Sequence, residues 1–392
     1  PRHLFHDFID LSDYRISWTV SDNGIKKYSE TFENINLKPG ESQSLVFPVS
    51  TMILPAGVER YIDFSVTLKK DYPFMPAGFE VAHDQFKMEG EHINTIATKG
   101  LPKLSYAETN ETITITGENF VISFGKSAGT ISSYEINGME LMQKGPQINF
   151  WRPANDNDKG SQMLNRLGIW REVSREAKPS GIKIEQAENN KITVTASYNL
   201  EKVKSKEVVT YNFFGSGVIE VKVSFTTNEE KLPDMPRFGL RWEVPVNFDN
   251  LTYFGRGPQE NYIDRNHSAF VGIYSGKIAD QYFKYVRPQE NGYKTDVRWF
   301  ELRNENEVGI RVTGDPVIGF SALHNPIEDF DMETPDDYRH TNDIVKKDGV
   351  FICTDLKMMG VAGDDSWGAR PYPEYSIPAK NYEFSFTIEP VF

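Results

Sequence analysis

Two acidic clusters in the sequence carry side chains of the type that cleave sugars. Residues 156–158 read Asp-Asn-Asp, and residues 363–367 read Gly-Asp-Asp-Ser-Trp. Hydrolysis of a glycosidic bond requires two carboxyl groups about 5 to 9 Å apart across the sugar. The sequence alone does not place the two clusters that close, and acids that cap loop turns explain the same residues. The clusters are therefore candidates for a site, and a catalytic pair is only one of the two interpretations.

Trp367 ends the second cluster and is a candidate for binding a sugar. Its neighbours are small or acidic, which indicates a loop, whereas Trp18 has apolar neighbours at a period of two, as in the core strand of a sheet. An indole held out by a loop offers a flat apolar face and one N–H donor, which suit a sugar ring and its hydroxyl rim. The alternative is a tryptophan packed in a seam between domains.

The tetrapeptide Pro-Gln-Glu-Asn occurs twice, starting at Pro258 and at Pro288. The first copy is followed by Tyr-Ile-Asp-Arg and the second by Gly-Tyr-Lys-Thr, so the shared hydrophobic frame of a true repeat is missing. Each copy offers a proline that fixes φ and polar side chains that can bond to the backbone. Loop scaffolding and direct contact with a sugar both remain open for these segments.

Other chemistries lack their sequence patterns. The seven histidines are scattered, and only His3 and His6 are close, in a segment that reads as a loop. The sequence has no Gly-x-Ser-x-Gly elbow and no phosphate-binding loop. We therefore expect no metal site in this chain.

Charge and composition narrow the class of partner. The formal net charge of -13 argues against nucleic acid and against an anionic membrane, and is compatible with a neutral sugar. Cys353 is the only cysteine, so an internal disulfide is excluded. No apolar run approaches membrane-span length, and the first residues lack the apolar core of a signal peptide. The sequence starts with proline, which is expected of a processed product or an excised piece, and it does not indicate a compartment.

The elements that position these residues are almost all strands. Alternation with a period of two marks residues 16–20, 62–68, 120–124, 192–195 and 221–225. Turn signals such as Asn23-Gly24 and Asn137-Gly138 separate such segments. One helix is predicted to start at Thr334, ahead of a proline and two acids, and a second helix or lid lies between residues 161 and 177. Many short strands with few helices predict β-sandwiches.

A domain boundary is predicted between residues 90 and 108, where the sequence is polar and contains glycine and proline. The roughly ninety residues before it suit one small sandwich. The longer segment after it has strand signals throughout and is large for a single pair of sheets.

Four segments resemble signature motifs of the family 2 glycoside hydrolases of the β-galactosidase type. They follow the family's order and rough spacing at residues 149–160, 253–265, 286–292 with Arg298-Trp299, and 359–368. Residues 8–14, Trp18 and residues 77–82 resemble the immunoglobulin-like domain that precedes these motifs in the family. The resemblance covers nearly the whole chain. Asn155 stands where the family often has threonine, and Ala362 where glycine is usual, which puts only local turn geometry in doubt.

The resemblance implies an all-β fold: an immunoglobulin-like β-sandwich at residues 1–92, a linker at 93–108, and a large galactose-mutarotase-like β-supersandwich at 109–392, the β-galactosidase small-chain domain. In the family, a glutamate acid/base and a glutamate nucleophile both lie on a (β/α)₈ barrel. Such a barrel takes roughly 250 residues of alternating strands and helices. No stretch of this chain has that alternation.

The resemblance therefore implies the non-catalytic C-terminal part of a retaining β-galactosidase, an enzyme that hydrolyses terminal β-D-galactosides. This part would supply an active-site wall, a loop and assembly surface, with no catalytic residue of its own. Its implied partners are the barrel of the same enzyme and the galactoside, with neither nucleic acid nor membrane, in a complete enzyme that is a homo-oligomer. No cofactor is expected in this chain, because the family's Mg²⁺ and Na⁺ are bound mainly by the barrel.

The resemblance also assigns roles to site residues. In family galactosidases the tryptophan that matches Trp367 reaches into the barrel's mouth and forms a platform for the aglycone sugar. The segment after Gly160 lies beside the active site in the family and shifts between open and closed positions, so we expect it to be mobile here, with an ordinary surface loop as the alternative. The residues expected to support these loops are Arg152, Asp156, Asn157, Asp158, Gly160, Asp364 and Asp365.

Two other functions remain open. The chain could be a free-standing carbohydrate-binding module, or the small subunit of a two-chain β-galactosidase. It could also be a mutarotase-like sugar epimerase, since the large domain resembles the galactose mutarotases. That chemistry would need a histidine and a glutamate in one cleft, and His267, His324 and His340 are available but lie in no matching motif.

Overall fold

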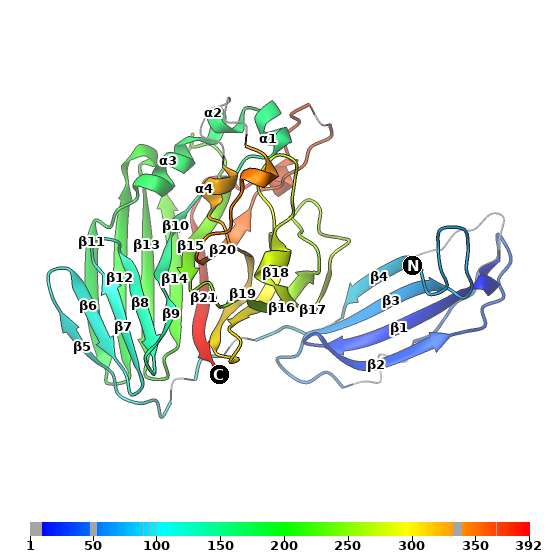
Figure 1. The fold of residues 1–392 in the computed structure, drawn as a ribbon, viewed down its shortest axis with the longest axis horizontal. Coiled ribbons are helices and arrows are strands. Elements are labelled where there is room, and N and C mark those ends of the chain that lie inside the picture. The colour runs from blue at the N-terminus through cyan, green and yellow to red at the C-terminus, as the bar shows by residue number, and fades with distance from the viewer. Residues whose placement is uncertain are drawn as a thin grey trace. The chain divides into compact units, whose positions relative to one another are not determined.

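The protein is described by a computed structural model, which covers residues 10–47, 53–88, 90–93, 95–97, 99–331, 339–365 and 367–392. The chain divides into two compact units, the first running to residue 93 and including residues 271–273, the second formed by the rest. In both units the described residues are dominated by strands (Figure 1), so the prediction of an all-β chain is confirmed.

The described part of the first unit is one antiparallel sheet in the order β2-β1-β3-β4. Its elements are a 3₁₀ turn at Leu11–Asp13, β1 (Tyr14–Asp22), β2 (Ile25–Phe32), β3 (Arg60–Leu68) and β4 (Glu80–Lys87). Asn23 and Gly24 form the β1–β2 turn with φ of 47° and 78°, which matches the predicted turn. Trp18 is 1% exposed and packs against Phe47, whose ring centroid is 5.2 Å away. The prediction that Trp18 is a core residue is confirmed.

The second unit, hereafter the large unit, contains two antiparallel sheets. The smaller has the order β5-β6-β7-β8-β9. The larger sheet has twelve strands and curls as it runs across the unit (Figure 1). Nine of its strands follow the order β10-β15-β20-β19-β21-β14-β13-β12-β11. The other three branch from β19: β18 pairs with β19, β16 pairs with β18, and β17 pairs with β16. The strands of the smaller sheet are β5 (Ser105–Glu108), β6 (Thr112–Thr116), β7 (Phe120–Gly125), β8 (Thr130–Ile136) and β9 (Met139–Met142). Those of the larger sheet are β10 (Lys144–Asn149), β11 (Gly181–Glu188), β12 (Lys191–Leu200), β13 (Ser205–Phe214), β14 (Ile219–Thr227), β15 (Arg237–Val244), β16 (Asn250–Gly257), β17 (Phe270–Lys277), β18 (Lys294–Arg303), β19 (Gly309–Leu323), β20 (Val350–Met358) and β21 (Tyr382–Val391).

The structure corrects the end of the predicted linker at residues 93–108. Its last four residues form β5, which pairs with β6 from Ser105↔Thr116 to Glu108↔Ile113. The segment Ser-Tyr-Ala-Glu has no clear alternation, and all four residues are exposed on this edge strand. Strand formation here depends on the neighbouring strand and is not visible in the local pattern.

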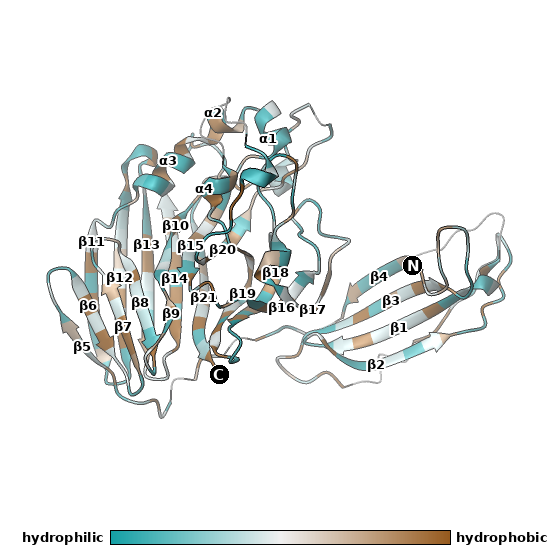
Figure 2. Cartoon of the chain, in the orientation of Figure 1, coloured by the Kyte–Doolittle hydropathy of each residue, from teal (hydrophilic) through white to brown (hydrophobic). Residues whose placement is uncertain are grey.

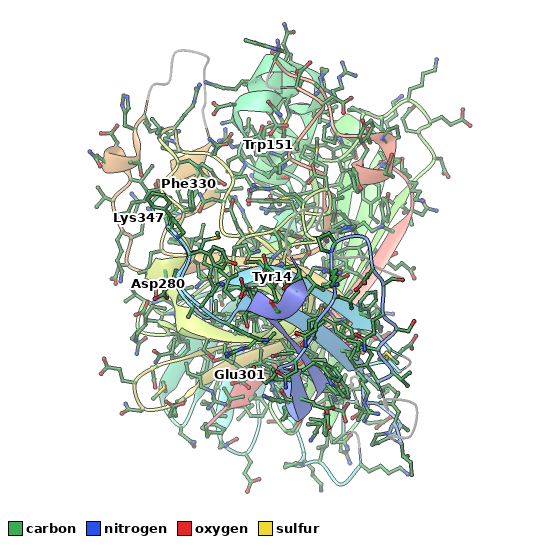
Figure 3. All side chains as sticks on the ribbon, turned by 90° about the vertical axis from the view of Figure 1, so that its right-hand side faces the viewer. Tyr14, Trp151, Asp280, Glu301, Phe330 and Lys347 are labelled. Atoms are coloured by element: carbon green, nitrogen blue, oxygen red, sulfur yellow. The ribbon has the colours of Figure 1, made fainter. Side chains whose placement is uncertain are left out.

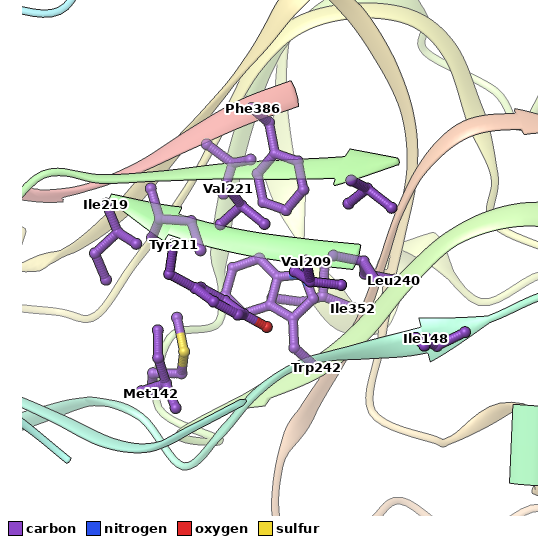
Figure 4. Close-up of a cluster of buried hydrophobic side chains, with 14 of the residues drawn as sticks. Met142, Ile148, Val209, Tyr211, Ile219, Val221, Leu240, Trp242, Ile352 and Phe386 are labelled. Carbon is purple, nitrogen blue, oxygen red and sulfur yellow. The ribbon is translucent and has the colours of Figure 1, made fainter. Parts of the chain in front are cut away.

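The core of the large unit fills the space between its two sheets. Apolar and polar residues alternate along the strands (Figure 2), which buries one face of each sheet. Phe124 from β7 and Tyr211 from β13 meet edge to face with ring centroids 5.3 Å apart, so the two sheets are in direct contact. Figure 4 shows Tyr211, Val221 and Trp242 in this cluster, and the Tyr211 hydroxyl donates to the carbonyl of Pro146 at 3.0 Å.

Short helices gather at one end of the large unit (Figure 1): α1 (Asp156–Gly160), α2 (Met163–Leu167), α3 (Ile169–Glu176) and α4 (Ile327–Phe330). Further 3₁₀ turns lie at Glu201–Val203, Ile278–Gln281, Thr341–Asp343 and Pro373–Tyr375. The helix predicted between residues 161 and 177 is confirmed as α2 and α3, whereas the one predicted to start at Thr334 lies outside the described residues. Within the described ranges, no helix has the length and apolar character needed to cross a membrane.

The segment after Gly160 is packed against the core. Met163 is fully buried and Leu167 is 3% exposed. Two side chains of the segment thus pack on the core, and the expectation that the segment is mobile stays a prediction. The polar run just after Gly160 does not indicate the apolar residues that one further turn of helix brings onto the core.

Glu207 is an isolated buried carboxyl group on β13. It has no exposed surface, and neither of its carboxylate oxygens has a hydrogen-bond partner in the described structure. Burial raises the pKa of Glu207 well above its ordinary value because water no longer solvates the charged form. The folded protein therefore holds this proton at pH values where the unfolded chain has released it.

We expect Glu207→Gln to change how stability depends on pH. Because the folded-state pKa is raised, the wild type loses stability as pH rises above about 4.5 toward that pKa, by up to about 1.4 kcal/mol per pH unit. Glutamine does not titrate, so the stability of the variant relative to wild type should grow with pH over this window. Urea unfolding at pH 5 and pH 8 measures this, with the exposed Glu185→Gln on β11 as the matched control. A difference between Glu207→Gln and wild type that is the same at both pH values would contradict the assignment.

Candidate functional site

The first motif, residues 149–160, forms a rigid anchor around Arg152. The Arg152 guanidinium is fully buried and makes a bidentate ion pair with Asp158, with Nη1–Oδ2 and Nη2–Oδ1 distances of 2.5 and 3.1 Å. Asp158 also closes a capping box at the start of α1, in which Asn155 Oδ1 accepts from the Asp158 N–H and Asp158 Oδ2 accepts from the Asn155 N–H. Asp158 therefore balances the buried charge of Arg152 and also caps the start of α1.

The anchor is tied to the fourth motif, residues 359–368. Arg152 Nη2 donates to the carbonyl of Gly360 at 3.2 Å, and Asn155 Nδ2 donates to the carbonyl of Val361 at 2.6 Å. The Oδ1 of Asn155 thus caps α1, and its Nδ2 bonds to the fourth motif. An amide can fill both roles because it carries one acceptor and one donor group. A threonine at this position would have a single hydroxyl for both.

Asp264 in the second motif holds the same segment from another direction. Its Oδ2 accepts from the backbone N–H groups of Val361 and Ala362, both at 2.8 Å. A Cβ on Gly360 would lie 2.6 Å from this oxygen, so the close approach requires glycine there. Three motifs that are distant in sequence thus converge on residues 360–362.

Trp367 stands on the loop that follows. Its side chain is 88% exposed, as expected for a loop indole and not for a core residue. Asp365 Oδ1 accepts from the N–H of Trp367 at 2.8 Å and from that of Ala369 at 3.2 Å, and the Tyr372 hydroxyl donates to Asp364 Oδ1 at 2.6 Å. Both carboxylates therefore shape the loop.

The Trp367 loop lies directly on the end of α1. A Cβ added to Gly160 would lie 2.8 Å from the Cα of Gly368 and 3.0 Å from the carbonyl oxygen of Trp367. Gly368 has φ of +104°, and a Cβ there would lie 2.3 Å from the carbonyl carbon of Gly160. Both glycines are needed for this contact, which fixes the backbone of Trp367 while its ring stays in solvent.

The first Pro-Gln-Glu-Asn segment forms hydrogen bonds with the residues that directly follow the second. Glu260 Oε2 in the first accepts from the N–H of Gly292, which directly follows the second, at 2.8 Å. Asn261 donates its backbone N–H to the carbonyl of Tyr293 at 2.8 Å. In the second segment, Gln289 Nε2 lies 3.5 Å from Asp156 Oδ2, which links it to α1. These bonds support the scaffolding interpretation for the first segment.

Glu290, in the second segment, belongs to a buried charge cluster with Arg237 and Asp355. Arg237 Nη2 lies 3.3 Å from Glu290 Oε1, and Arg237 Nε lies 3.0 Å from Asp355 Oδ2. Burial raises the pKa of Asp355 to about 7, partly offset by Arg237, and burial also raises the pKa of Glu290. Two buried carboxyl groups share one guanidinium, so the cluster holds a proton at lower pH and gains negative charge as pH rises.

The histidines named as candidates have separate surroundings. The His324 imidazole lies 3.0 Å from the Gly349 carbonyl and 3.0 Å from Asp249, whereas His267 and His340 are exposed. In the part of the chain that the structure describes, no three His, Cys, Asp or Glu side chains are close enough to hold a metal ion. His3 and His6 lie outside the described residues.

Most of the loop residues predicted from the sequence come together. Arg152, Asp158 and Gly160 belong to the anchor, and Asp364 and Asp365 belong to the Trp367 loop. Asp156 faces Gln289. The backbone carbonyl of Asn157 accepts from the N–H of Ser161. Sequence reasoning missed Asp264, Gly368 and the cluster around Arg237. Asp264 and Gly368 lie inside the quoted motifs, but only the fold shows that they touch the anchor.

Comparison with known families agrees with these motifs. Residues 116–388 match the family described as "Beta galactosidase small chain", and residues 5–89 match "Beta-galactosidase, domain 4". The first match covers more than half of the chain, so the chain belongs to the β-galactosidase small-chain family.

The most similar curated relatives include β-galactosidases of two bacteria. The chain is 31% identical over 390 residues to a β-galactosidase of Priestia megaterium, covering 98% of the chain and 37% of the relative. It is 31% identical over 387 residues to one of Streptococcus thermophilus, covering 98% and 36%. The chain therefore spans a little over a third of the length of the curated relatives it matches.

Solved structures with low sequence identity include two sugar-epimerase-like proteins. A galactose mutarotase related enzyme from Lactobacillus acidophilus is 13% identical, with a TM-score of 0.40 over 71% of this chain and 97% of that one. A putative aldose 1-epimerase from Escherichia coli K12 is 9% identical, with a TM-score of 0.38 over 73% and 99%.

Proposed function

We propose that this chain is the non-catalytic C-terminal part of a retaining β-galactosidase of glycoside hydrolase family 2. In the complete enzyme it supplies one wall of the active site, and Trp367 forms a platform for the sugar next to the galactose. The catalytic carboxylates, and the Mg²⁺ and Na⁺ ions expected for the complete enzyme, belong to the barrel. Terminal β-D-galactosides are the substrates.

The observation that carries this proposal is the state of Trp367. A large indole that is 88% exposed is normally a liability, because it offers apolar surface to water. Here its backbone is fixed by Asp365 and by the Gly160–Gly368 contact, so the ring is presented by a rigid support. A firmly supported, exposed aromatic face is what stacking of a sugar ring requires.

The first unit offers a second kind of surface that fits the proposal. Several of its aromatic and aliphatic side chains are exposed, which suits assembly with the remainder of a larger enzyme. The residues are Phe74, Phe79, Val81 and Phe86, with exposed fractions of 101, 45, 37 and 40%.

We expect Trp367→Ala in the complete enzyme to weaken binding of the aglycone glucose. Loss of a stacked aromatic platform removes roughly 1–1.5 kcal/mol, or about tenfold in affinity. KM for lactose should rise about tenfold and the yield of transgalactosylation should fall, while nitrophenyl β-galactoside remains a good substrate. Kinetics with both substrates measure this split.

Gly160→Ala is the companion variant in that experiment. It leaves the indole in place but disturbs the backbone beneath it, so it should shift KM for lactose in the same direction by a smaller factor. Gly181→Ala, where a Cβ meets open space, is the matched control and should leave both substrates unchanged. Equal loss of activity on lactose and on the nitrophenyl substrate in Trp367→Ala would refute the platform role.

A two-chain enzyme is a second candidate, favoured by the description of the matching family as a small chain. In that case the chain pairs with a separate barrel chain and contributes the same loop. Co-expression with a barrel chain, followed by co-purification and assay, separates the two arrangements.

A further inference from the structure

The large unit has a partly open cavity of about 300 Å³ between the edge of its large sheet and the segment around α4. Its floor comes from β10, β15, β20 and β19, which are neighbours in the sheet. Glu290 and Asn291, from the second Pro-Gln-Glu-Asn segment, form part of the wall. The volume is at the lower end of ligand pockets, about 300–1,000 Å³, and suits one sugar ring better than a chain of them.

The charged side chains that line the cavity are paired with one another or with the cluster behind it. Lys144 Nζ lies 2.6 Å from Glu243 Oε2, and Arg241 bonds to Glu328. Glu290 is paired with Arg237. The first two pairs balance in charge, and Glu290 shares Arg237 with Asp355, a cluster that is balanced while its two carboxyl groups hold one proton. The cavity therefore offers hydrogen-bonding groups without a strong field of either sign under that condition. Such a lining does not favour a charged ligand over a neutral one.

The uncharged polar groups leave both donors and acceptors available. Asn291 Oδ1 is buried without a hydrogen-bond partner in the described structure, although its Nδ2 donates to the Gln289 carbonyl at 2.8 Å. Both donors of the Asn325 amide are used, by Asp329 and by the Val345 carbonyl at 2.7 Å each, which leaves its Oδ1 as an acceptor. The exposed Gln147 side chain adds donors at the rim. Hydroxyl groups, which donate and accept, match this mixture.

The remaining lining is apolar and includes rings. Leu323 and Phe351 come from β19 and β20, and Phe330, labelled in Figure 3, comes from α4. Apolar walls with a few placed polar groups are typical of small-ligand sites, and the C–H faces of a sugar ring fit such walls. None of the lining residues is a histidine, so the cavity lacks the histidine that the epimerase alternative requires.

We propose that this cavity binds one neutral hexopyranose, such as galactose or glucose. The ring lies against the apolar floor, and its hydroxyl groups bond to the amides and to the paired carboxylates at the wall. The second Pro-Gln-Glu-Asn segment then has a ligand-facing role in addition to its scaffolding role, through Asn291. This site does not involve Trp367, so it does not rest on the platform proposed above.

Titration calorimetry and saturation-transfer NMR on the 392-residue chain test the proposal. The probes are D-galactose and D-glucose, with glucuronate as the charged analogue and cyclohexanol as an apolar ring of similar size. The double variant Arg241→Ala/Glu328→Ala removes a lining ion pair without changing net charge, and Ile327→Trp fills the rim. The matched control is Lys126→Ala/Glu108→Ala, which removes an ion pair of 2.6 Å on the small sheet.

We expect 1:1 binding of a neutral sugar that weakens about tenfold in Arg241→Ala/Glu328→Ala, as for loss of one or two hydrogen bonds to charged groups. Binding should be lost in Ile327→Trp and unchanged in the control. Absence of sugar binding, or equal or tighter binding of glucuronate or cyclohexanol, would overturn the proposal. So would binding that is lost in Trp367→Ala and kept in both cavity variants, which would support the platform alone. Circular dichroism of each variant establishes that it is folded.

Discussion

The purified 392-residue chain is expected to leave p-nitrophenyl β-D-galactoside unhydrolysed above the uncatalysed rate. Glycosidases reach enhancements of roughly 10⁶-fold and more, and this requires two carboxyl groups free to face one sugar. Two of the acids proposed from the sequence are committed elsewhere. Asp158 is bound to Arg152 in a buried bidentate pair, and Asp365 accepts two backbone N–H groups of its own loop.

The assay is made at high protein concentration with Asp156→Asn and Asp365→Asn as companion variants. Turnover that both variants retain comes from a contaminating enzyme and leaves the prediction standing. Turnover that either variant abolishes would show that the chain is catalytic by itself. The positive control is a complete β-galactosidase at a thousandth of the concentration, which fixes the detection limit.

Arg237→Met is expected to destabilise the large unit severely. The Arg237 side chain is fully buried, and its guanidinium lies over the Tyr293 ring at 5.5 Å and against two carboxyl groups. Removal of this cation leaves Glu290 and Asp355 buried without compensation, and such losses amount to about 3–5 kcal/mol. Urea unfolding followed by tryptophan fluorescence reports on the large unit, which holds five of the six tryptophans.

The loss should depend on pH in a defined direction. Without Arg237, the folded-state pKa values of both carboxyl groups rise further above their unfolded values. A carboxyl group with a raised pKa gives stability that is present at low pH and is lost as pH rises through the folded pKa. Since the pKa of Asp355 is already about 7 with Arg237 present, the difference from wild type should be smallest near pH 4–5 and grow through pH 7.

A compensated variant separates charge from packing. Arg237→Met/Glu290→Gln/Asp355→Asn removes all three charges and should recover more than half of the lost stability. Lys183→Met, in an ion pair with side chains 72% and 56% exposed, should cost about 0.5 kcal/mol or less. If the triple variant is as unstable as Arg237→Met, the cluster matters through shape and not through charge.

The strands and hairpin turns could be predicted from the sequence because they depend on neighbouring residues. Residues 62–68 lie in β3, and residues 120–124 lie in β7. Asn137 and Gly138 form a turn, with φ of 49° and 80°. Exposure of Trp367 followed from the polarity of its neighbours by the same local reasoning. The anchor of Arg152 could also be located, since its motif is contiguous.

The rest depends on pairings that local pattern does not contain. The sequence around Arg237 does not indicate that Asp355 lies beside it. A buried arginine and an exposed arginine have the same local sequence pattern in a strand, and only the pairing of β15 with β20 distinguishes them. The burial of Glu207 could not be predicted either. Its carboxyl group lies on the buried face of β13, whose residues otherwise show ordinary apolar and polar alternation. The apolar residues of α2 were missed because a five-residue helix is too short to show a period of 3.6 residues.

The position of β21 constrains how the large unit is made. This strand, Tyr382–Val391, lies between β14 and β19, so the final residues of the sequence complete the middle of the sheet and not its rim. During synthesis, Ile219 must wait for Ile388 to leave the ribosome before the two can pair. Until then β14 and β19 present unpaired edges that invite association with other chains. Such distant pairings also slow folding, so the sheet is completed late, and a chain cut before β21 would leave the sheet divided in two.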